Sequence, residues 1–328
     1  MELRQVQTFR AVAEELSFSR AAARLGYVQS SVSAQVAALE RELGVRLFDR
    51  LGRRIALTEA GSVLLGYSRE LLVLATEARE AVVDAGAEAG EVTGTLTVSA
   101  PETLLTYRLP RLLAVFHEAY PKVRLSVRPS AVGRLVGSTR RAVEEGMVDV
   151  AFVLDAPVVV PGLAVESLIE EDVSVIAPSG HALASTLVSP QDLSGEAVLL
   201  PEAPESGCAY RGQFEHQLGK TGTVPSERME FQSIEAVKQC VAAGMGVSVL
   251  ISVAVEAEVR AGRLAALRWE EPFEVFTQIV WHEKRWKSPA LRAFLGTARE
   301  IITASAGYST LSPSSGWPAP AHSSSPPA

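Results

Sequence analysis

The chain has few residues suited to metal or thiol chemistry: only two cysteines, Cys208 and Cys240, occur among its 328 residues. Two cysteines cannot form the disulfide framework of a small secreted domain, and they are too far apart for one C-x-x-C zinc motif. The five histidines follow no metal-ligand spacing, and no serine stands in a G-x-S-x-G context. The G-M-G run at 244–246 is too short for a dinucleotide fingerprint. We therefore expect no enzyme activity, no metal and no resident cofactor.

Long apolar runs are also missing. No stretch approaches the roughly 18 uninterrupted apolar residues that a membrane span needs. The first residues carry Glu2, Glu14 and Glu15 without a continuous apolar core, which argues against a secretory signal. The sequence predicts a cytoplasmic protein with no membrane partner.

Positive charge is scarce overall, with 31 basic and 38 acidic side chains and a net charge of −7. Residues 1–58, however, hold nine arginines and six acids and carry a net +3, so any site for a polyanion must be local to this end. At the other end, residues 304–328 consist mainly of Ala, Gly, Pro and Ser without periodicity. We predict a disordered tail there.

The first 58 residues have the pattern of a small helical domain followed by a hairpin. Apolar spacing predicts helices at 3–14, at 20–25 and from residue 29, and the run at 45–57 alternates loosely around a turn rich in arginine. The apolar stripe of the third helix comprises Val32, Val36, Leu39 and Leu43. Two helices joined by a tight turn and followed by a wing favour DNA binding, with the exposed start of the third helix in a major groove.

The predicted DNA contacts lie at the start of the third helix and on the wing. They are Gln29, Ser30, Ser31, Ser33, Arg50, Arg53 and Arg54. The arginines would supply the salt-sensitive phosphate contacts, and the polar helix residues would reach base edges or nearby phosphates. In the alternative interpretation the arginines only solvate a turn and the serines cap a helix. The combination of helix, turn and wing favours DNA.

A long helix is predicted at 59–88, and it carries a heptad seam. The seam residues assigned to dimerisation are Leu64, Tyr67, Leu71, Leu74 and Ala78. A seam of this length on a helix outside a compact domain needs a partner helix, and the simplest partner is a second copy. We predict a homodimer.

Beyond this helix, short β-rich runs alternate with helical runs, which predicts an α/β domain at 92–303. The pattern divides it into lobe I, at about 92–161 and 268–303, and lobe II, at about 162–267. Two crossovers would leave a cleft between the lobes, with strand ends and helix starts facing it.

Ordered motifs in the chain resemble the LysR-type transcriptional regulators. In residues 1–88 these are FRAVAEELSFSRAAARLG from Phe9, QSSVS from Gln29, LERELGVRLFDR from Leu39 and LTEAG from Leu57. Weaker matches are GTLTVS from Gly94, LPRLL from Leu109, YPKV from Tyr120 and AAGMGV from Ala242, so only the tail lies outside the resemblance.

The resemblance implies a winged helix-turn-helix joined to a two-lobed effector domain similar to type 2 periplasmic binding proteins. It also implies a homodimer or homotetramer on double-stranded promoter DNA, with RNA polymerase as a further partner. The family's helix contacts fall on Gln29, Ser30 and Ser33, and its wing contacts on Arg53 and Arg54. One departure is Ala34, where the family often has arginine; base discrimination then depends more on DNA shape or on other positions.

The resemblance places an effector pocket between the lobes. Its predicted residues are Ser99, Glu102, Thr103, Ser130, Pro201, Cys208 and Ser233. Hydroxyls and free N–H groups at helix starts suit a small anion or metabolite, although each serine can equally be a simple helix cap.

Three other hypotheses apply to the cleft domain. Cys208, at a helix start near Arg211, would suit a thiol or redox sensor, but Cys240 fits a small packed residue and provides no partner thiol. A cytoplasmic enzyme or a solute-binding protein would account for the two lobes but not for residues 1–88.

Overall fold

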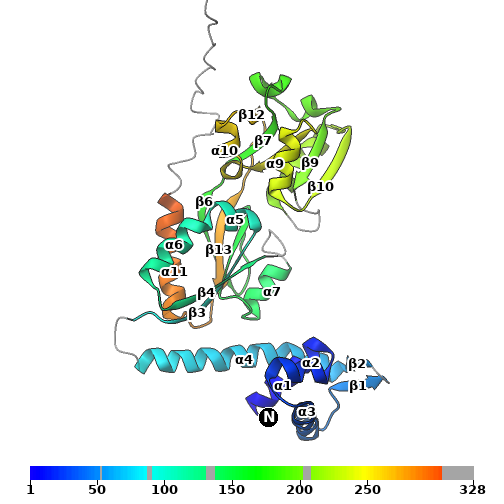
Figure 1. The fold of residues 1–328 in the computed structure, drawn as a ribbon, viewed down its shortest axis with the longest axis vertical. Coiled ribbons are helices and arrows are strands. Elements are labelled where there is room, and N and C mark those ends of the chain that lie inside the picture. The colour runs from blue at the N-terminus through cyan, green and yellow to red at the C-terminus, as the bar shows by residue number, and fades with distance from the viewer. Residues whose placement is uncertain (52–53, 87–90, 131–136, 202–207, 305–328) are drawn as a thin grey trace, which may run out of the picture. The chain divides into compact units, whose positions relative to one another are not determined.

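The computed structural model describes residues 1–51, 54–86, 91–130, 137–201 and 208–304, with the backbone alone at positions 50, 51 and 54 (Figure 1). The chain forms two compact units. The first comprises Met1–Glu91, Glu145–Met147 and Trp286–Pro289, and the second comprises Val92–Glu144, Val148–Arg285 and the chain from residue 290 onward. Most of the predicted tail, from residue 305, lies outside the described residues.

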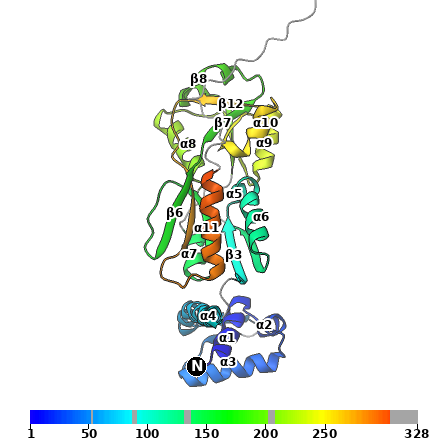
Figure 2. The same ribbon diagram turned by 90° about the vertical axis from the view of Figure 1, so that its left-hand side faces the viewer.

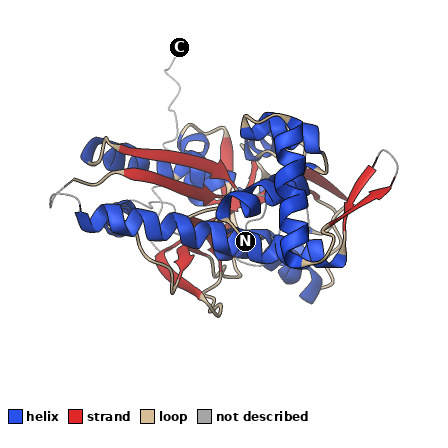
Figure 3. Cartoon of the chain, turned by 90° about the horizontal axis from the view of Figure 1, so that it is seen from below, coloured by secondary structure: helices blue, strands red, loops and turns tan. Residues whose placement is uncertain are grey.

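The first unit is a three-helix head followed by a hairpin and a long helix. Its elements are α1 (Leu3–Glu15), α2 (Phe18–Leu25), α3 (Gln29–Leu43), β1 (Phe48–Leu51), β2 (Arg54–Leu57) and α4 (Glu59–Gly86). Figure 3 shows β1 and β2 as a hairpin projecting from the helices. Phe48 joins the hairpin to the helical core, since its ring lies 5.4 Å from that of Phe9 and 5.8 Å from that of Phe18. The predicted helices and wing are therefore present.

Local signals set the helix boundaries in the head. The Ser17 hydroxyl accepts a hydrogen bond from the Arg20 N–H and caps α2, and Gly26 ends that helix with a left-handed φ of 69°. Gly44 ends α3 in the same way. One prediction is wrong: Leu43 does not continue the buried stripe of α3, because it lies beside this C-cap and is 39% exposed.

The start of α4 packs tightly against the segment before the hairpin. A Cβ at Gly61 would lie 2.1 Å from the Leu47 carbonyl oxygen, so only glycine permits this approach. The Thr58 N–H donates to the same carbonyl, and the Thr58 hydroxyl accepts from the Gly61 N–H. The helix therefore starts from a fixed point on the head, and it then extends beyond α1, α2 and α3 (Figure 1).

The second unit contains two mixed sheets. Lobe I has the strand order β4-β3-β5-β13-β6, and lobe II has the order β10-β9-β11-β7-β12-β8. The lobe I strands are β3 (Gly94–Ala100), β4 (Val123–Pro129), β5 (Val150–Asp155), β6 (Leu163–Glu170) and β13 (Phe276–His282). The lobe II strands are β7 (Val173–Pro178), β8 (Leu187–Val188), β9 (Ala197–Pro201), β10 (Glu227–Phe231), β11 (Val247–Ile251) and β12 (Leu264–Trp269).

Helices cover both faces of the lobe I sheet (Figure 2). Its helices are α5 (Glu102–Tyr107), α6 (Leu109–Ala119), α7 (Ser138–Glu144) and α11 (Pro289–Ala304). Phe152 of β5 faces α6 and α11 in the main core, whereas its neighbours Ala151 and Val153 pack in a separate cluster with Val143 of α7. This alternation is the period of two expected for a strand buried on both faces.

Lobe II carries α8 (Ala209–Lys220), α9 (Ile234–Ala242), α10 (Glu256–Arg260) and the 3₁₀ turns η1 (Ala182–Ser185), η2 (Pro190–Leu193) and η4 (Ser252–Ala254). Its central strand β11 is fully buried, and β7 is buried except at its two ends. The G-M-G run packs here: Gly246 has a φ of 150°, and a Cβ there would lie 2.2 Å from the Ala197 carbonyl oxygen. Gly246 therefore allows the start of β11 to lie close to β9.

The predicted lobe boundary needs a correction. Residues 163–170 were assigned to lobe II, but they form β6, which pairs antiparallel with β13 in the lobe I sheet. The chain crosses between the lobes after β6 and again before β13. The error has a physical reason: an amphipathic strand pattern does not reveal its pairing partner, and this partner lies more than a hundred residues downstream.

Among the described helices, none is long and apolar enough to span a bilayer.

Candidate functional site

The start of α3 is exposed. Residues 27–30 are all exposed, and the Gln29 amide donates to the Ser33 hydroxyl at 3.0 Å, one turn further along. Ser31 is half-buried and accepts from the Gln35 amide, whose oxygen accepts from Thr8 of α1. Of the predicted helix contacts, Gln29, Ser30 and Ser33 are therefore placed together on the outer side, and Ser31 lies toward α1.

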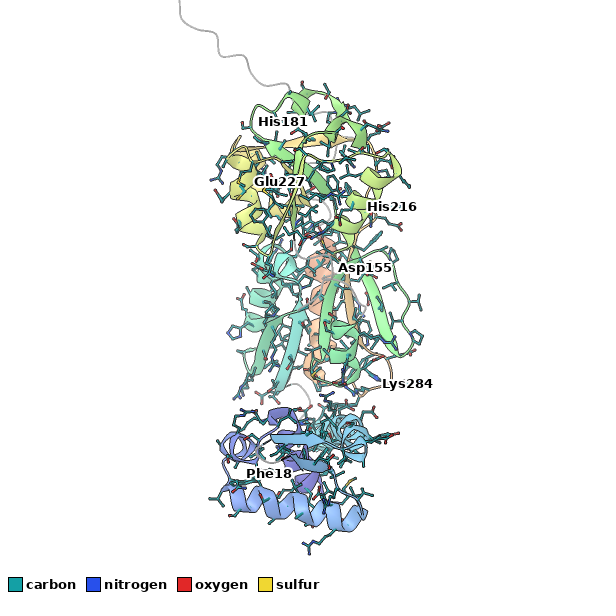
Figure 4. All side chains as sticks on the ribbon, turned by 90° about the vertical axis from the view of Figure 1, so that its right-hand side faces the viewer. Phe18, Asp155, His181, His216, Glu227 and Lys284 are labelled. Atoms are coloured by element: carbon teal, nitrogen blue, oxygen red, sulfur yellow. The ribbon has the colours of Figure 1, made fainter. Side chains whose placement is uncertain are left out.

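Ion pairs hold α2 against the end of α1 and so fix the angle at which α3 is presented. The Arg24 guanidinium lies 2.6 Å from a Glu14 oxygen and 3.2 Å from a Glu15 oxygen. These hydrogen bonds, that to Glu14 foremost, raise the pKa of Arg24. Figure 4 labels Phe18, which begins α2 inside the same head.

The predicted wing arginines fall where the structure describes little. Arg50 and Arg54 belong to β1 and β2, whose last pair is Leu51 and Arg54. The side chains of Arg50 and Arg54, and all of Arg53, lie outside the described residues. Their phosphate role stays a prediction.

The outer surface of α4 carries apolar side chains. Tyr67 and Leu74 are 63% and 62% exposed, and Val63 and Val82 are exposed on the same side of the helix. Leu71 is half-buried and Ala78 is exposed, while Leu64 packs against the core of the head. The predicted seam is therefore mostly available to a partner, and Val63 is a member that the heptad count missed.

The lobe I residues predicted for the effector meet at one end of the sheet. Ser99 lies buried near the end of β3, Thr103 lies buried in the first turn of α5, and Ser130 follows β4 and donates its N–H to the Ala100 carbonyl at 2.8 Å. The hydroxyl oxygens of Thr103 and Ser130 are shielded from solvent and have no hydrogen-bond partner among the described residues. Glu102 is exposed. Two neighbouring segments thus present unsatisfied hydroxyls beyond the carboxyl ends of β3 and β4.

The lobe II residues predicted for the effector are placed at strand ends and helix starts. Pro201 ends β9, Cys208 is the buried N-cap residue of α8, and Ser233 caps α9 by accepting the Ala236 N–H. Ser233 is therefore a helix cap, as the alternative interpretation stated. Residues 202–207, between Pro201 and Cys208, lie outside the described residues.

The surroundings of Cys208 add nothing specific to the thiol hypothesis. Arg211, which was expected to activate the thiol, is 2.7 Å from Glu230 and 3.2 Å from Glu215. Cys240 is half-buried and packs against the core. No group of three or more His, Cys, Asp or Glu suited to a metal occurs in the described part of the chain.

A buried ion pair lies at the crossovers between the lobes. Glu171, which follows β6, accepts three hydrogen bonds from the Arg108 guanidinium, at 2.6, 2.9 and 3.2 Å, and one from the Thr277 hydroxyl at 2.6 Å. The Glu171 side chain is fully buried, and its backbone N–H donates to the Val275 carbonyl. One carboxylate therefore links the junction of α5 and α6 to both crossovers.

A second cluster bridges the lobes directly. Lys238 of α9 donates to the Tyr107 hydroxyl of α5 at 3.1 Å, to Glu235 at 2.7 Å, and lies 3.0 Å from Glu258. The Tyr107 hydroxyl also donates to Glu235. Burial acts to lower the pKa of Lys238, but these hydrogen bonds outweigh it and raise the pKa above its ordinary value. The lysine is therefore held charged between the lobes.

Comparison with known families decides which class of protein this architecture serves. Residues 3–62 match the family described as bacterial regulatory helix-turn-helix protein, lysR family, and residues 89–302 match the LysR substrate binding domain. The chain belongs to the LysR family of transcriptional regulators. It is a DNA-binding regulator with an effector-binding domain, and the predicted family, fold class and general function are confirmed.

Relatives and solved structures extend over nearly the whole LysR-type chain. It is 39% identical over 303 residues to the uncharacterized regulator YwqM of Bacillus subtilis, covering 92% of this chain and all of that one. It is 36% identical to the regulator CbbR of Rhodospirillum rubrum, covering 90% and 96%. The fold matches a full-length OxyR variant of Pseudomonas aeruginosa with a TM-score of 0.65 and 24% identity, covering 92% and 94%. It matches CbnR in complex with its target DNA with a TM-score of 0.62 and 23% identity, covering 92% and 100%.

Sequence analysis of this LysR-type chain missed the two inter-lobe clusters. A signal for one of them existed: Ile234, Val237, Lys238 and Val241 follow the helical spacing of a buried face. Lysine is seldom buried without a partner, so a lysine on that face predicts a nearby carboxylate. For Arg108 and Glu171 no such local pattern was available.

Proposed function

We propose that this LysR-type regulator binds promoter DNA as a homodimer or homotetramer. A small anionic metabolite binds between its lobes and changes promoter occupancy, which in turn changes the access of RNA polymerase to the promoter. Promoter binding places the protein in the cytoplasm. The observation that carries the effector site is the pair of shielded hydroxyls of Thr103 and Ser130, which have no hydrogen-bond partner in the part of the chain that the structure describes.

Buried hydroxyls need an acceptor. A shielded polar group without a hydrogen-bond partner costs about 1–3 kcal/mol, and a ligand that accepts these bonds recovers that energy. Hydroxyl donors at the carboxyl ends of parallel strands suit a carboxylate or phosphate oxygen. Ser99 lies near the end of β3 and adds a third hydroxyl to this group. These features support a small organic acid as the effector.

The inter-lobe clusters offer a route from ligand to DNA. A ligand that favours one lobe angle will strengthen or weaken the Tyr107–Lys238 hydrogen bond and the Arg108–Glu171 ion pair. In an oligomer, a change of lobe angle alters the spacing of the DNA-binding heads. The two spacings are then two states with different affinities for DNA, as allosteric coupling requires.

The first experiment measures binding of the purified protein to DNA from upstream of its own gene across a salt series, and then with succinate, citrate, glutamate, benzoate or inorganic phosphate present. The expected result is specific DNA binding and one class of anion that both raises the Tm and shifts DNA affinity. The variants Thr103→Val and Ser130→Ala should lose the anion response and keep basal DNA binding. An anion response unchanged in both variants would reject the site.

The role of the bridge is tested with Tyr107→Phe, which removes the hydroxyl that joins the two lobes. We expect the free energy of unfolding to fall by about 1 kcal/mol, the net value of one hydrogen bond, with a matching fall in Tm. We also expect the shift in DNA affinity that the active anion causes to change severalfold. Tyr120→Phe is the matched control, because Tyr120 stacks on Phe116 within lobe I at 5.0 Å. Equal behaviour of the two variants would contradict the coupling role.

A further inference from the structure

The residue before the recognition helix exposes apolar surface where a polar cap is usual. Val28 occupies the N-cap position of α3, makes no side-chain cap hydrogen bond and is 69% exposed. Valine is among the poorest N-cap residues, because it offers no acceptor for the free N–H groups of the first turn.

Local packing does not account for this valine. In a hydrophobic staple, the apolar residue that packs back onto the helix is the one before the N-cap, here Tyr27. Tyr27 lies beneath the Arg4 guanidinium, 5.2 Å from the ring centre. Val28 belongs neither to the core of the head nor to the residues packed against it. Within the described part of the head its two methyl groups face solvent.

Before Arg41, which is exposed near the end of the helix, the outer face of α3 is short of long hydrogen-bond donors. Ala34 and Ala37 are exposed, and Gln29 is the long polar side chain at the helix start, held by Ser33. In a helix-turn-helix protein the N-terminal residues of this helix meet base edges in the major groove. The apolar feature of those edges is the C5-methyl group of thymine.

We propose that Val28 is a specificity-determining residue that packs against the methyl group of a thymine in the operator, next to the base pair contacted by Gln29. The apolar side chain then replaces part of the discrimination that long donors would give, and it explains why the helix start tolerates a poor cap. The proposal uses the DNA-binding role of the family and does not depend on the effector site.

Substitution of uracil for thymine tests this contact, because it removes the methyl group alone. An operator is selected from random-sequence DNA with the full-length protein, and each thymine is then replaced in turn. At one position we expect uracil to weaken binding by the wild-type protein about fourfold, the factor for burial of one methyl group. In Val28→Ala the thymine and uracil operators should bind equally. Val45→Ala is the matched control, because Val45 is a 48% exposed valine beyond the other end of α3.

Val28→Ser separates recognition from a purely structural role. Serine supplies the missing cap, so the Tm should rise, while discrimination between thymine and uracil should disappear. A uracil penalty that is absent from the wild-type protein, or equally large in Val28→Ala, overturns the proposal. A change of oligomer size in either Val28 variant with unchanged thymine preference also overturns it, because Val28 would then contact protein.

Discussion

One buried carboxylate, that of Glu171, lies at the crossovers between the lobes. The Glu171 carboxylate receives its hydrogen bonds from Arg108 and Thr277 in a place that water does not reach. Removing Arg108 would leave a buried charge with only a hydroxyl to balance it. We therefore predict that Arg108→Ala lowers the free energy of unfolding by about 3–5 kcal/mol.

Chemical denaturation measures this change. Arg111→Ala provides the control, since Arg111 is exposed in the first turn of α6, three residues after Arg108, and its loss should stay within about 0.5 kcal/mol. Similar midpoints for the two variants would show that the buried pair contributes little.

Asp149 gives a prediction about pH. Burial raises the pKa of Asp149, and this effect exceeds the opposing effects of the Thr97 N–H, which donates to the carboxylate at 2.7 Å, and of Arg285. The folded state holds the proton more tightly than the unfolded chain. The free energy of unfolding therefore falls as the pH rises from 3.8, the ordinary pKa of aspartate, through the raised pKa of folded Asp149. Asp149→Asn keeps an acceptor for Thr97 and should raise the Tm at pH 7 but not at pH 3. A Tm gain that does not vary with pH would argue against the shifted carboxyl.

Elements with local signals were predictable from the sequence, and their assembly was less so. The ends of α2 and α3 follow from Gly26 and Gly44, which act within one turn, whereas α2 begins at Phe18, two residues before the predicted start. The assignment of β6 to a lobe failed because its partner β13 is distant in the chain. In the candidate site the hydroxyls of Thr103 and Ser130 were named from the family resemblance. That both would lack partners could not be known before packing was seen.

The exposed apolar face of α4 predicts self-association. Tyr67→Glu combined with Leu74→Glu places two charges on this face, and we expect the dimer dissociation constant to rise at least about tenfold, because burial of each such side chain gives roughly 1.5–3 kcal/mol. Sedimentation of the purified protein measures the change. Thr76→Glu is the control, since it lies about 180° from Tyr67 around the helix. A dimer equally stable in all variants would place the interface elsewhere.

At the scale of the whole molecule, charge is divided between a basic head and an acidic remainder. The wing arginines Arg53 and Arg54 should therefore account for much of the salt dependence of DNA binding. We predict that Arg53→Ala with Arg54→Ala weakens binding to all sequences and lowers the slope of log affinity against log salt by about 0.9 for each phosphate that the variant no longer neutralises. An unchanged slope would exclude a phosphate role for these two arginines.

The pairing of β6 with β13 has a consequence for how the second unit is built. The two strands pair antiparallel, with Glu170 opposite Phe276, and the Glu171 N–H donates a hydrogen bond to the Val275 carbonyl just beyond that pair. Seen this way, β6 and β13 form a hairpin, and all of lobe II is its loop. A two-residue turn in place of that loop would connect the same strands without moving either. The lobe I sheet is thus complete without any strand of lobe II, and we expect it to form before lobe II folds.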